Sequence, residues 1–207
     1  LATEGLGTKW EVPLVSVKPI PACHFTHASA DAAAVLGEKH GLKTSQIESV
    51  RVLVPAEVVK TVCEPVATKQ RPQNSYDAQF SIPYTVATGL LRGSFGLQHL
   101  EEPALQDAEV IALAHRVKYE TDPDSPFPKY YSGEVIVTTT DGRELRHREE
   151  VNRGASDRPL SAADIEAKFM GNATLVASPA RAQQLLEAVL TLDRAPSARS
   201  FALALAR

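Results

Sequence analysis

The chain has 207 residues, of which 43% are hydrophobic and 23% are charged, and its net charge is −3. Such a chain can fold into a globular protein with a sizeable core, whereas a nucleic-acid partner normally needs a dense basic stripe that is missing here. No apolar run approaches the length of a membrane span, and two cysteines, Cys23 and Cys63, are too few for a zinc ribbon or an iron–sulfur cluster.

The first part of the chain predicts a strand and then a helix. Residues 10–18 have a strand-like composition, although Pro13 within them indicates a sheet edge or a bulge. An alanine-rich stretch follows and predicts a helix that Thr26 or Ser29 caps and Gly41 stops.

The next segment predicts a strand, a short helix and a loop. β-branched residues favour a strand over 47–54, and a short helix over 56–63 should end before Pro65. The polar, turn-rich stretch 66–77 predicts a loop. Its basic residues 69–71 could contact an acidic ligand, but a short charged loop is usually just solvated.

Two helices are predicted in the middle of the chain. Ser81 is expected to cap a helix from Ile82 to Arg92 that Gly93 stops. This helix is apolar on most sides, so it should be well buried. The spacing of apolar residues predicts another helix over 104–115.

The last third predicts a β-hairpin followed by helices. Strands over 131–140 and 143–151 flank Asp141-Gly142, a pair typical of a type I′ turn. Ser161 and Asp164 have the spacing of a capping box that opens a helix. Two further amphipathic helices are expected over 180–192 and 197–206. Strands mixed with helices up to about residue 155, and helices alone afterwards, predict an α+β fold with a helical C-terminal segment.

The densest group of reactive side chains lies just before a predicted helix: Lys18, Cys23, His24 and His27. The start of a helix presents unpaired N–H groups and a partial positive charge, to which a lysine adds a full charge. The group is therefore a candidate anion pocket. The alternative is a proline-stiffened loop with solvated side chains, and the residues alone give it about equal weight.

Other candidate residues have weaker support. His24 and His27 stand three residues apart, but no Asp/Glu or Cys pair at ligand spacing accompanies them, so we expect no metal site. Tyr84, in the first turn of a buried helix, is a candidate general acid or substrate donor. The alternative, a core tyrosine whose hydroxyl bonds to the backbone, has the better support from the sequence. We find no phosphate-binding glycine loop and no dinucleotide fingerprint.

Several motifs, in the same order along the chain, resemble those of the MmgE/PrpD family. The run GLGTKWEVPLVSVKPIPACHFTHASADAA contains the pattern K-x-x-P-x-C-x-x-x-H before an Asp-Ala helix. The run AQFSIPYTVATGLLRG resembles the F-S-x-P-Y segment of the family. The hairpin turn and the later Lys168-Phe169 continue the resemblance, which covers nearly the whole chain.

The resemblance implies a division into three parts. Family members combine a large helical domain with a smaller α+β lid, place the active site between the two, and typically form dimers. On this mapping, residues 1–14 are an entry segment, residues 15–155 are the lid, and residues 156–207 are helices that belong to the helical domain. The N-terminal helical part of the family, with its catalytic Asp and His, would be absent, so this chain alone is expected to be inactive.

The resemblance also implies a function: part of a cofactor-independent hydro-lyase of the 2-methylcitrate dehydratase type. It would act on small di- and tricarboxylates by acid–base proton transfer. An epimerase of the iminodisuccinate type, a decarboxylase of the cis-aconitate type, and a non-catalytic binding or dimerisation module remain alternatives. We expect a cytoplasmic homodimer that needs no metal or cofactor and has no nucleic-acid or membrane partner.

The site residues carried over from the family motifs are Lys18, His27 and Tyr84, with His24 as a further substrate contact. Lys18 would bind a carboxylate or stabilise charge. Tyr84 would act as a donor or acid, and His27 would take part in proton transfer.

Overall fold

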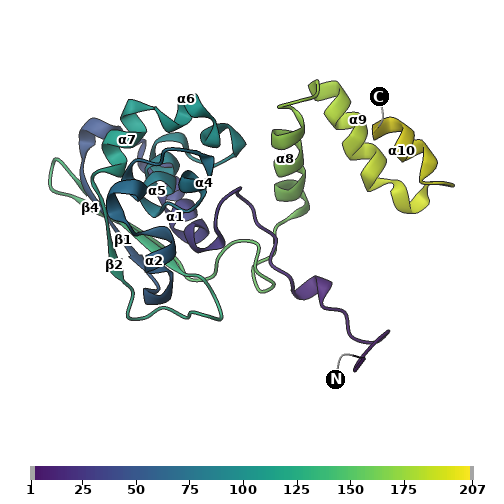
Figure 1. The fold of residues 1–207 in the computed structure, drawn as a ribbon, viewed down its shortest axis with the longest axis horizontal. Helices are drawn as coiled ribbons and strands as arrows, with labels where there is room; N and C mark the ends of the chain where they lie inside the picture. Colours follow the sequence, from purple (N-terminus) through teal and green to yellow (C-terminus); the bar gives the residue numbers. More distant parts are fainter. Residues whose placement is uncertain (1–2, 206–207) are drawn as a thin grey trace. The chain divides into compact units, whose positions relative to one another are not determined.

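The structure, a computed structural model, describes residues 3–205 and contains two compact units, Leu1–Pro159 and Leu160–Arg207 (Figure 1). The first unit holds a four-stranded mixed sheet covered by helices, and the second is helical. The α+β fold class with a helical C-terminal segment is therefore confirmed. The lid and helical-domain boundaries remain a prediction.

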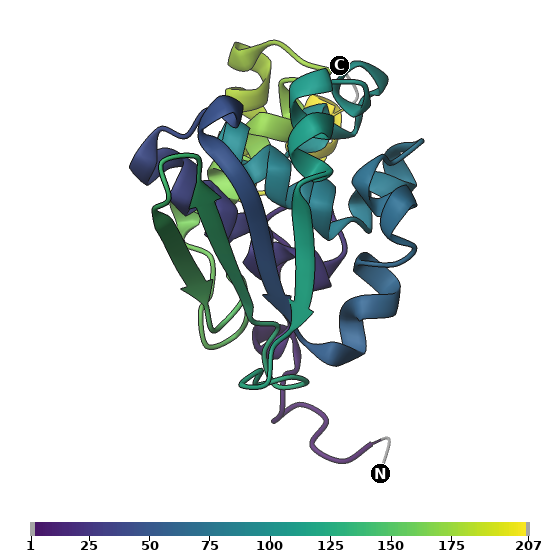
Figure 2. The ribbon, with the colours of Figure 1, turned by 90° about the vertical axis from the view of Figure 1, so that its left-hand side faces the viewer.

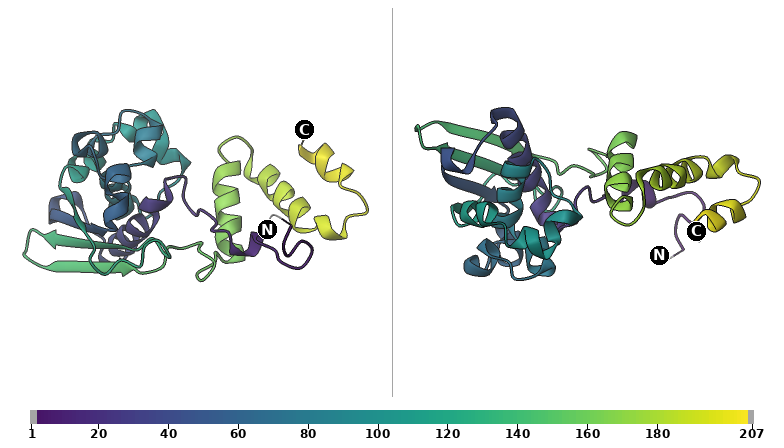
Figure 3. Two further views of the ribbon diagram at one scale, coloured as in Figure 1. Left: turned by 60° about the horizontal axis from the view of Figure 1, so that its bottom comes forward. Right: turned by 90° about the horizontal axis from the view of Figure 1, so that it is seen from above.

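The sheet has the strand order β2-β1-β3-β4. The strands are β1 (Ile47–Val54), β2 (Val117–Thr121), β3 (Gly133–Thr139) and β4 (Glu144–Glu149). β1 runs parallel to β2 and antiparallel to β3, and β4 returns antiparallel to β3 as a hairpin at the sheet edge (Figure 3). Val50, Val52 and Val54 alternate along β1 and are fully buried, because helices cover that face of the sheet (Figure 2).

The helices of the first unit are short apart from α1 and α5. The α-helices of the chain are α1 (His24–His40), α2 (Val59–Val62), α3 (Val66–Gln70), α4 (Ser75–Gln79), α5 (Ile82–Arg92), α6 (Glu102–Leu105), α7 (Ala108–Ala114), α8 (Ala162–Ala173), α9 (Pro179–Leu190) and α10 (Arg199–Leu205). Short 3-10 helices are η1 (Val12–Leu14), η2 (Thr44–Gln46), η3 (Ala56–Val58), η4 (Leu97–Leu100) and η5 (Leu192–Arg194).

α1 and α5 pack with unusually close backbones. A Cβ added to Gly37 of α1 would stand 2.2 Å from the carbonyl oxygen of Leu90, and one added to Gly89 of α5 would stand 2.8 Å from that of Ala30. Only glycine permits this separation, which draws α1 against the core. The close packing fixes the position of the α1 N-terminus, where the candidate residues lie.

Most strong local signals are confirmed. Ser81 caps α5 by accepting from the Tyr84 amide at 3.0 Å, and Ser161 forms the predicted capping box with Asp164. The helix predicted after residue 26 begins earlier, at His24, and neither Thr26 nor Ser29 caps it. The hydroxyl of Thr26 instead donates to the carbonyl oxygen of Cys23 at 2.8 Å.

Four predictions about local structure are wrong. Residues 10–18 form no strand, because nothing in the sheet pairs with them, and Val12–Leu14 is a 3-10 turn instead. The segment 66–77 contains α3 and α4 rather than a loop, since its polar Asn74 accepts from the Asp77 amide as an N-cap. The helix predicted over 104–115 is interrupted where the Asp107 side chain caps α7. The hairpin exists, but Gly142 alone of its turn pair has a positive φ, of 84°, so the turn is not type I′.

β2 has no counterpart among the predicted elements, because Val117 alone of its residues is buried and the segment has only a weak apolar pattern. Within the described part of the chain, no helix combines the length and apolarity that crossing a membrane requires.

The glycine contact between α1 and α5 can be tested by adding one methyl group. We expect Gly37→Ala to lower the free energy of unfolding by about 3 kcal/mol, because the backbones must separate. Gly171→Ala in α8, where a Cβ meets nothing within 4 Å, should instead stabilise by about 0.5–1 kcal/mol. Urea unfolding followed by circular dichroism measures both, and an unchanged midpoint for Gly37→Ala would contradict the packing.

Candidate functional site

The candidate residues at the start of α1 converge with a distant loop. His24 and His27 lie in the first two turns of α1, and Lys18 lies in the segment that leads into it. Asn152, which follows β4, reaches the same place across 128 residues of sequence. We call these four residues the α1 cluster.

The side chain of Asn152 determines which nitrogen of His24 carries the proton. Its Oδ1 accepts from the backbone N–H of Tyr131 at 3.1 Å, so its amide nitrogen must face His24, where it lies 2.8 Å from Nε2. An amide N–H can only donate, so His24 Nε2 accepts and the proton of the neutral ring is on Nδ1. Asn152 is 2% exposed, which keeps this arrangement away from competing water.

His27 has the opposite tautomer. Its Nε2 lies 3.2 Å from the carbonyl oxygen of Ala22, an acceptor, so this nitrogen carries the hydrogen. Its Nδ1 is buried and has no hydrogen-bond partner among residues 3–205. The His24 and His27 rings lie 4.7 Å apart.

Both histidines stay neutral at physiological pH. Burial, together with the neighbouring His24 ring and the positive charge of Lys18, lowers the pKa of His27 to about 3. Burial and the nearby ammonium of Lys18 also lower the pKa of His24. Protonation of His24 would in addition place two N–H donors against each other at Asn152.

Lys18 is exposed, and its Nζ donates to the carbonyl oxygen of Ala22 at 3.2 Å. The same carbonyl accepts from His27, so one backbone oxygen organises two members of the α1 cluster. This arrangement holds a cation at the start of the longest helix.

The loop after β4 is tied to the segment before α1. Val17 donates its N–H to the carbonyl oxygen of Gly154 at 2.9 Å. Gly154 has a φ of 89°, and a Cβ there would stand 2.0 Å from the carbonyl oxygen of Val17. Arg153 next to it forms a two-pronged ion pair with Asp31 of α1, at 3.1 and 2.9 Å.

Aromatic rings pack beside the α1 cluster. Tyr131 meets His24 edge-on at 5.0 Å between ring centroids, and Phe25 and Phe127 pack against Tyr131. Together with the hydrogen bond of its N–H to Asn152, these contacts fix Tyr131 beside His24.

The structure does not bring Tyr84 to the α1 cluster. Its side chain is 1% exposed, and its hydroxyl lies 2.8 Å from the carbonyl oxygen of His99 and 3.1 Å from that of Ala104. Tyr84 is five residues from Gly89, which touches α1, so it projects about 140° away around the helix. Burial, with a smaller effect of Asp107, raises the pKa of Tyr84 to about 12. These contacts fit the alternative of a core tyrosine bonded to the backbone.

Sequence reasoning missed Asn152, Tyr131 and Arg153. The sequence gives little indication of their role, because a polar loop after a hairpin is common. Only the tertiary fold brings this loop to α1. Within residues 3–205, no group of three or more His, Cys, Asp or Glu side chains could hold a metal ion.

The arrangement can bind and stabilise an anion. Lys18 supplies a full charge and neutral His24 supplies an Nδ1–H donor, both at a helix start where backbone N–H groups add partial positive charge. A carboxylate, or an oxygen that gains negative charge during a reaction, fits these donors.

Comparisons with known proteins agree on one family. The profile of the MmgE/PrpD C-terminal domain matches residues 20–194. The chain is 30% identical over 186 residues to the cis-aconitate decarboxylase of Mus musculus and 29% identical over 185 residues to that of Homo sapiens. Both alignments cover 86% of this chain, which spans 37% of the length of these relatives.

The buried, neutral state of His27 predicts a pH-dependent stability. An unfolded chain binds a proton at His27 near pH 6.5, whereas the folded chain binds it only near pH 3. Stability should therefore fall as the pH drops below about 6.5, by up to about 1.4 kcal/mol per pH unit from this group. Urea unfolding between pH 7 and pH 4 measures how the free energy of unfolding depends on pH, and this dependence should have a shallower slope for His27→Gln than for the wild type. His40→Gln, a change at an exposed histidine, should keep the wild-type slope, and equal slopes for all three proteins would contradict the burial of a neutral His27.

Proposed function

The chain belongs to the MmgE/PrpD family, and we propose that it is the C-terminal part of an enzyme that converts small di- or tricarboxylates without a cofactor. One observation carries the proposal: a lysine and two neutral histidines converge at a helix start, held by an asparagine from a distant loop. Fixed donors of this kind stabilise a substrate that gains negative charge beside a carboxylate.

Lys18 is proposed to bind a substrate carboxylate. It is exposed, so a ligand can reach it, and its hydrogen bond to Ala22 sets its position before binding. Arg153 is not proposed as a substrate contact, because Asp31 pairs with it in two-pronged geometry.

His24 is proposed to stabilise the charge that develops on the substrate. Its Nδ1–H donates a hydrogen bond, and the neutral ring keeps its proton because loss would leave an imidazolate. Asn152 and Tyr131 hold the ring and are positioning residues. His27, with a pKa of about 3, is a weak base at neutral pH. We propose that it packs under His24. The acid that protonates carbon after the loss of CO2, or the base that dehydration or epimerisation would need, is proposed to come from the part of the relatives' length that this chain does not span.

The reaction is proposed to be a decarboxylation of the cis-aconitate type. Both relatives carry that name, and the loss of CO2 leaves an electron pair beside a carboxylate, which Lys18 and His24 can stabilise. The rival reactions are dehydration of 2-methylcitrate and epimerisation of iminodisuccinate, which pass through intermediates with similar additional negative charge. Tyr84 has no proposed contact with the substrate, because its hydroxyl lies against the carbonyl oxygens of His99 and Ala104.

A non-catalytic binding or dimerisation module is the rival from another class. Such a module would bind a polycarboxylate at Lys18, or form the expected homodimer, without turnover. The product analysis below separates it from the enzymatic proposals.

NMR product analysis tests the proposed reaction. The complete polypeptide that carries this sequence is mixed in turn with cis-aconitate, 2-methylcitrate and iminodisuccinate. We expect CO2 and a five-carbon dicarboxylate from cis-aconitate. Lys18→Gln should lower kcat/KM by about a hundredfold or more, because a charge that stabilises the transition state is lost.

Lys9→Gln is the matched control, since Lys9 is an exposed cation paired only with the nearby Glu11, and it should keep full activity. Turnover of 2-methylcitrate alone would replace the proposed decarboxylation by dehydration as the reaction of the protein. Absence of turnover with all three acids, or full activity of Lys18→Gln, would refute the catalytic proposal.

A further inference from the structure

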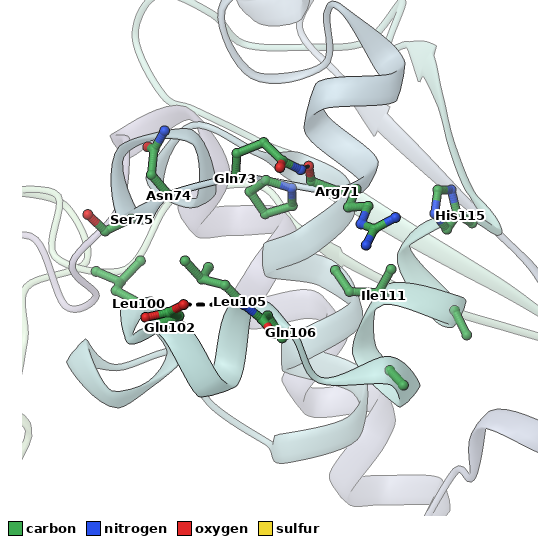
Figure 4. A pocket seen from close by; sticks show the side chains of 13 residues that line it. Arg71, Gln73, Asn74, Ser75, Leu100, Glu102, Leu105, Gln106, Ile111 and His115 are labelled. Atoms are coloured by element: carbon green, nitrogen blue, oxygen red, sulfur yellow. Dashed lines mark hydrogen bonds between the residues drawn. The ribbon is translucent and has the colours of Figure 1, made fainter.

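A cavity of about 810 Å³ lies between the segment 71–75 and the helices α6 and α7 (Figure 4). None of its lining residues belongs to the α1 cluster. The volume is within the range of small-molecule sites in proteins.

The floor of the cavity is apolar and firmly held. Leu105 is 9% exposed and belongs to the main hydrophobic core, and the half-buried Leu100 and Ile111 pack against that core. The floor is therefore preformed and offers a hydrocarbon group a surface to cover.

One end of the cavity carries a cation and a held histidine. The side chain of Gln70 donates to the carbonyl oxygens of His115 and Val117, both at 3.3 Å, and its Oε1 meets Nδ1 of His115 at 3.3 Å. These bonds bring Arg71, the next residue in the chain, to the same end as His115, and both line the cavity.

The exposed guanidinium of Arg71 pairs with no carboxylate of residues 3–205. Arg51, Arg92, Arg148, Arg153 and Arg158 each pair with a carboxylate. Arg116, which also has no carboxylate partner among the described residues, instead donates to the backbone carbonyl oxygens of Thr44 and Ile47. Lys69, a neighbour of Arg71, is buried and donates to the carbonyl oxygen of Thr61 at 2.8 Å. Of this basic pair, Arg71 is the exposed cation that a ligand can reach.

The opposite wall limits the ligand to a single negative charge. Glu102 accepts from Gln106 at 3.4 Å there (Figure 4), so a second carboxylate on the ligand would meet a like charge. Arginine binds carboxylates through two parallel N–H donors. The cavity thus combines one anion-binding end, an apolar floor and an acidic far wall.

We propose that this cavity is a second ligand site, which binds a small monocarboxylic acid with an apolar chain. The carboxylate pairs with Arg71 beside His115, and the hydrocarbon chain lies on Leu105 and Ile111. Its preference differs from that of the α1 cluster, for which polycarboxylates are proposed, so the two sites can be tested separately.

Isothermal titration calorimetry of the complete polypeptide that carries this sequence tests the site, with octanoate as the probe. Octanoate should bind saturably at one site, and acetate and tricarballylate should bind much more weakly. Arg71→Gln should weaken octanoate binding roughly tenfold, because a charged hydrogen-bond partner is removed. Lys39→Gln, which removes an exposed lysine at the end of α1, should leave the affinity unchanged.

Two variants of opposite charge at Ala112 distinguish an effect on ligand binding from an effect on folding. Ala112 lines the cavity from α7 and is exposed, so larger side chains fit there without disturbing the core. Ala112→Lys should strengthen octanoate binding and Ala112→Glu should weaken it. The proposal is overturned if the wild-type chain does not bind octanoate saturably, if Arg71→Gln binds as tightly as wild type, or if both Ala112 variants bind alike.

Discussion

The hydrogen bond between the Asn152 amide and Nε2 of His24 is the interaction on which the candidate site depends. It joins a loop after β4 to the first turn of α1 at 2.8 Å, and the backbone N–H of Tyr131 fixes its direction at 3.1 Å. Two sets of glycine contacts support this bond. Close contacts with α5 fix the position of α1, and Gly154 allows its loop to contact the segment before α1. The tertiary fold thus determines that His24 carries its proton on Nδ1, where it can be donated in a hydrogen bond to a substrate.

The neutral state of His24 and His27 determines the charge of the α1 cluster. Two histidines next to a lysine would repel one another if they were protonated, and burial adds to that cost, so both remain neutral. Lys18 is then the cation of the α1 cluster that a substrate can reach. A site with one accessible cation and neutral donors can bind an anion and still respond to the additional charge that forms in a reaction. The proposed chemistry on a polycarboxylate follows from this combination.

The sequence predicts what depends on local chemistry and fails where the fold brings distant residues together. Ser81, Ser161 and the β-branched run 47–54 acted as their local patterns indicate. Lys18, His24 and His27 were found because they are close in sequence, and the structure keeps them together. Asn152 was missed because nothing near residue 24 identifies a partner 128 residues away. Tyr84 sits in the motif that suggested it, but helix geometry turns its side chain into the core.

Long-range nitrogen–hydrogen NMR correlations of the 15N-labelled chain measure the tautomers of His24 and His27 directly. We expect two neutral rings at pH 7.5, with the proton on Nδ1 of His24 and on Nε2 of His27. Replacement of Asn152 by Asp should then move the proton of His24 to Nε2, which would donate to the new carboxylate. Rings that are both charged at pH 7.5, or a wild-type His24 that carries its proton on Nε2, would contradict this arrangement.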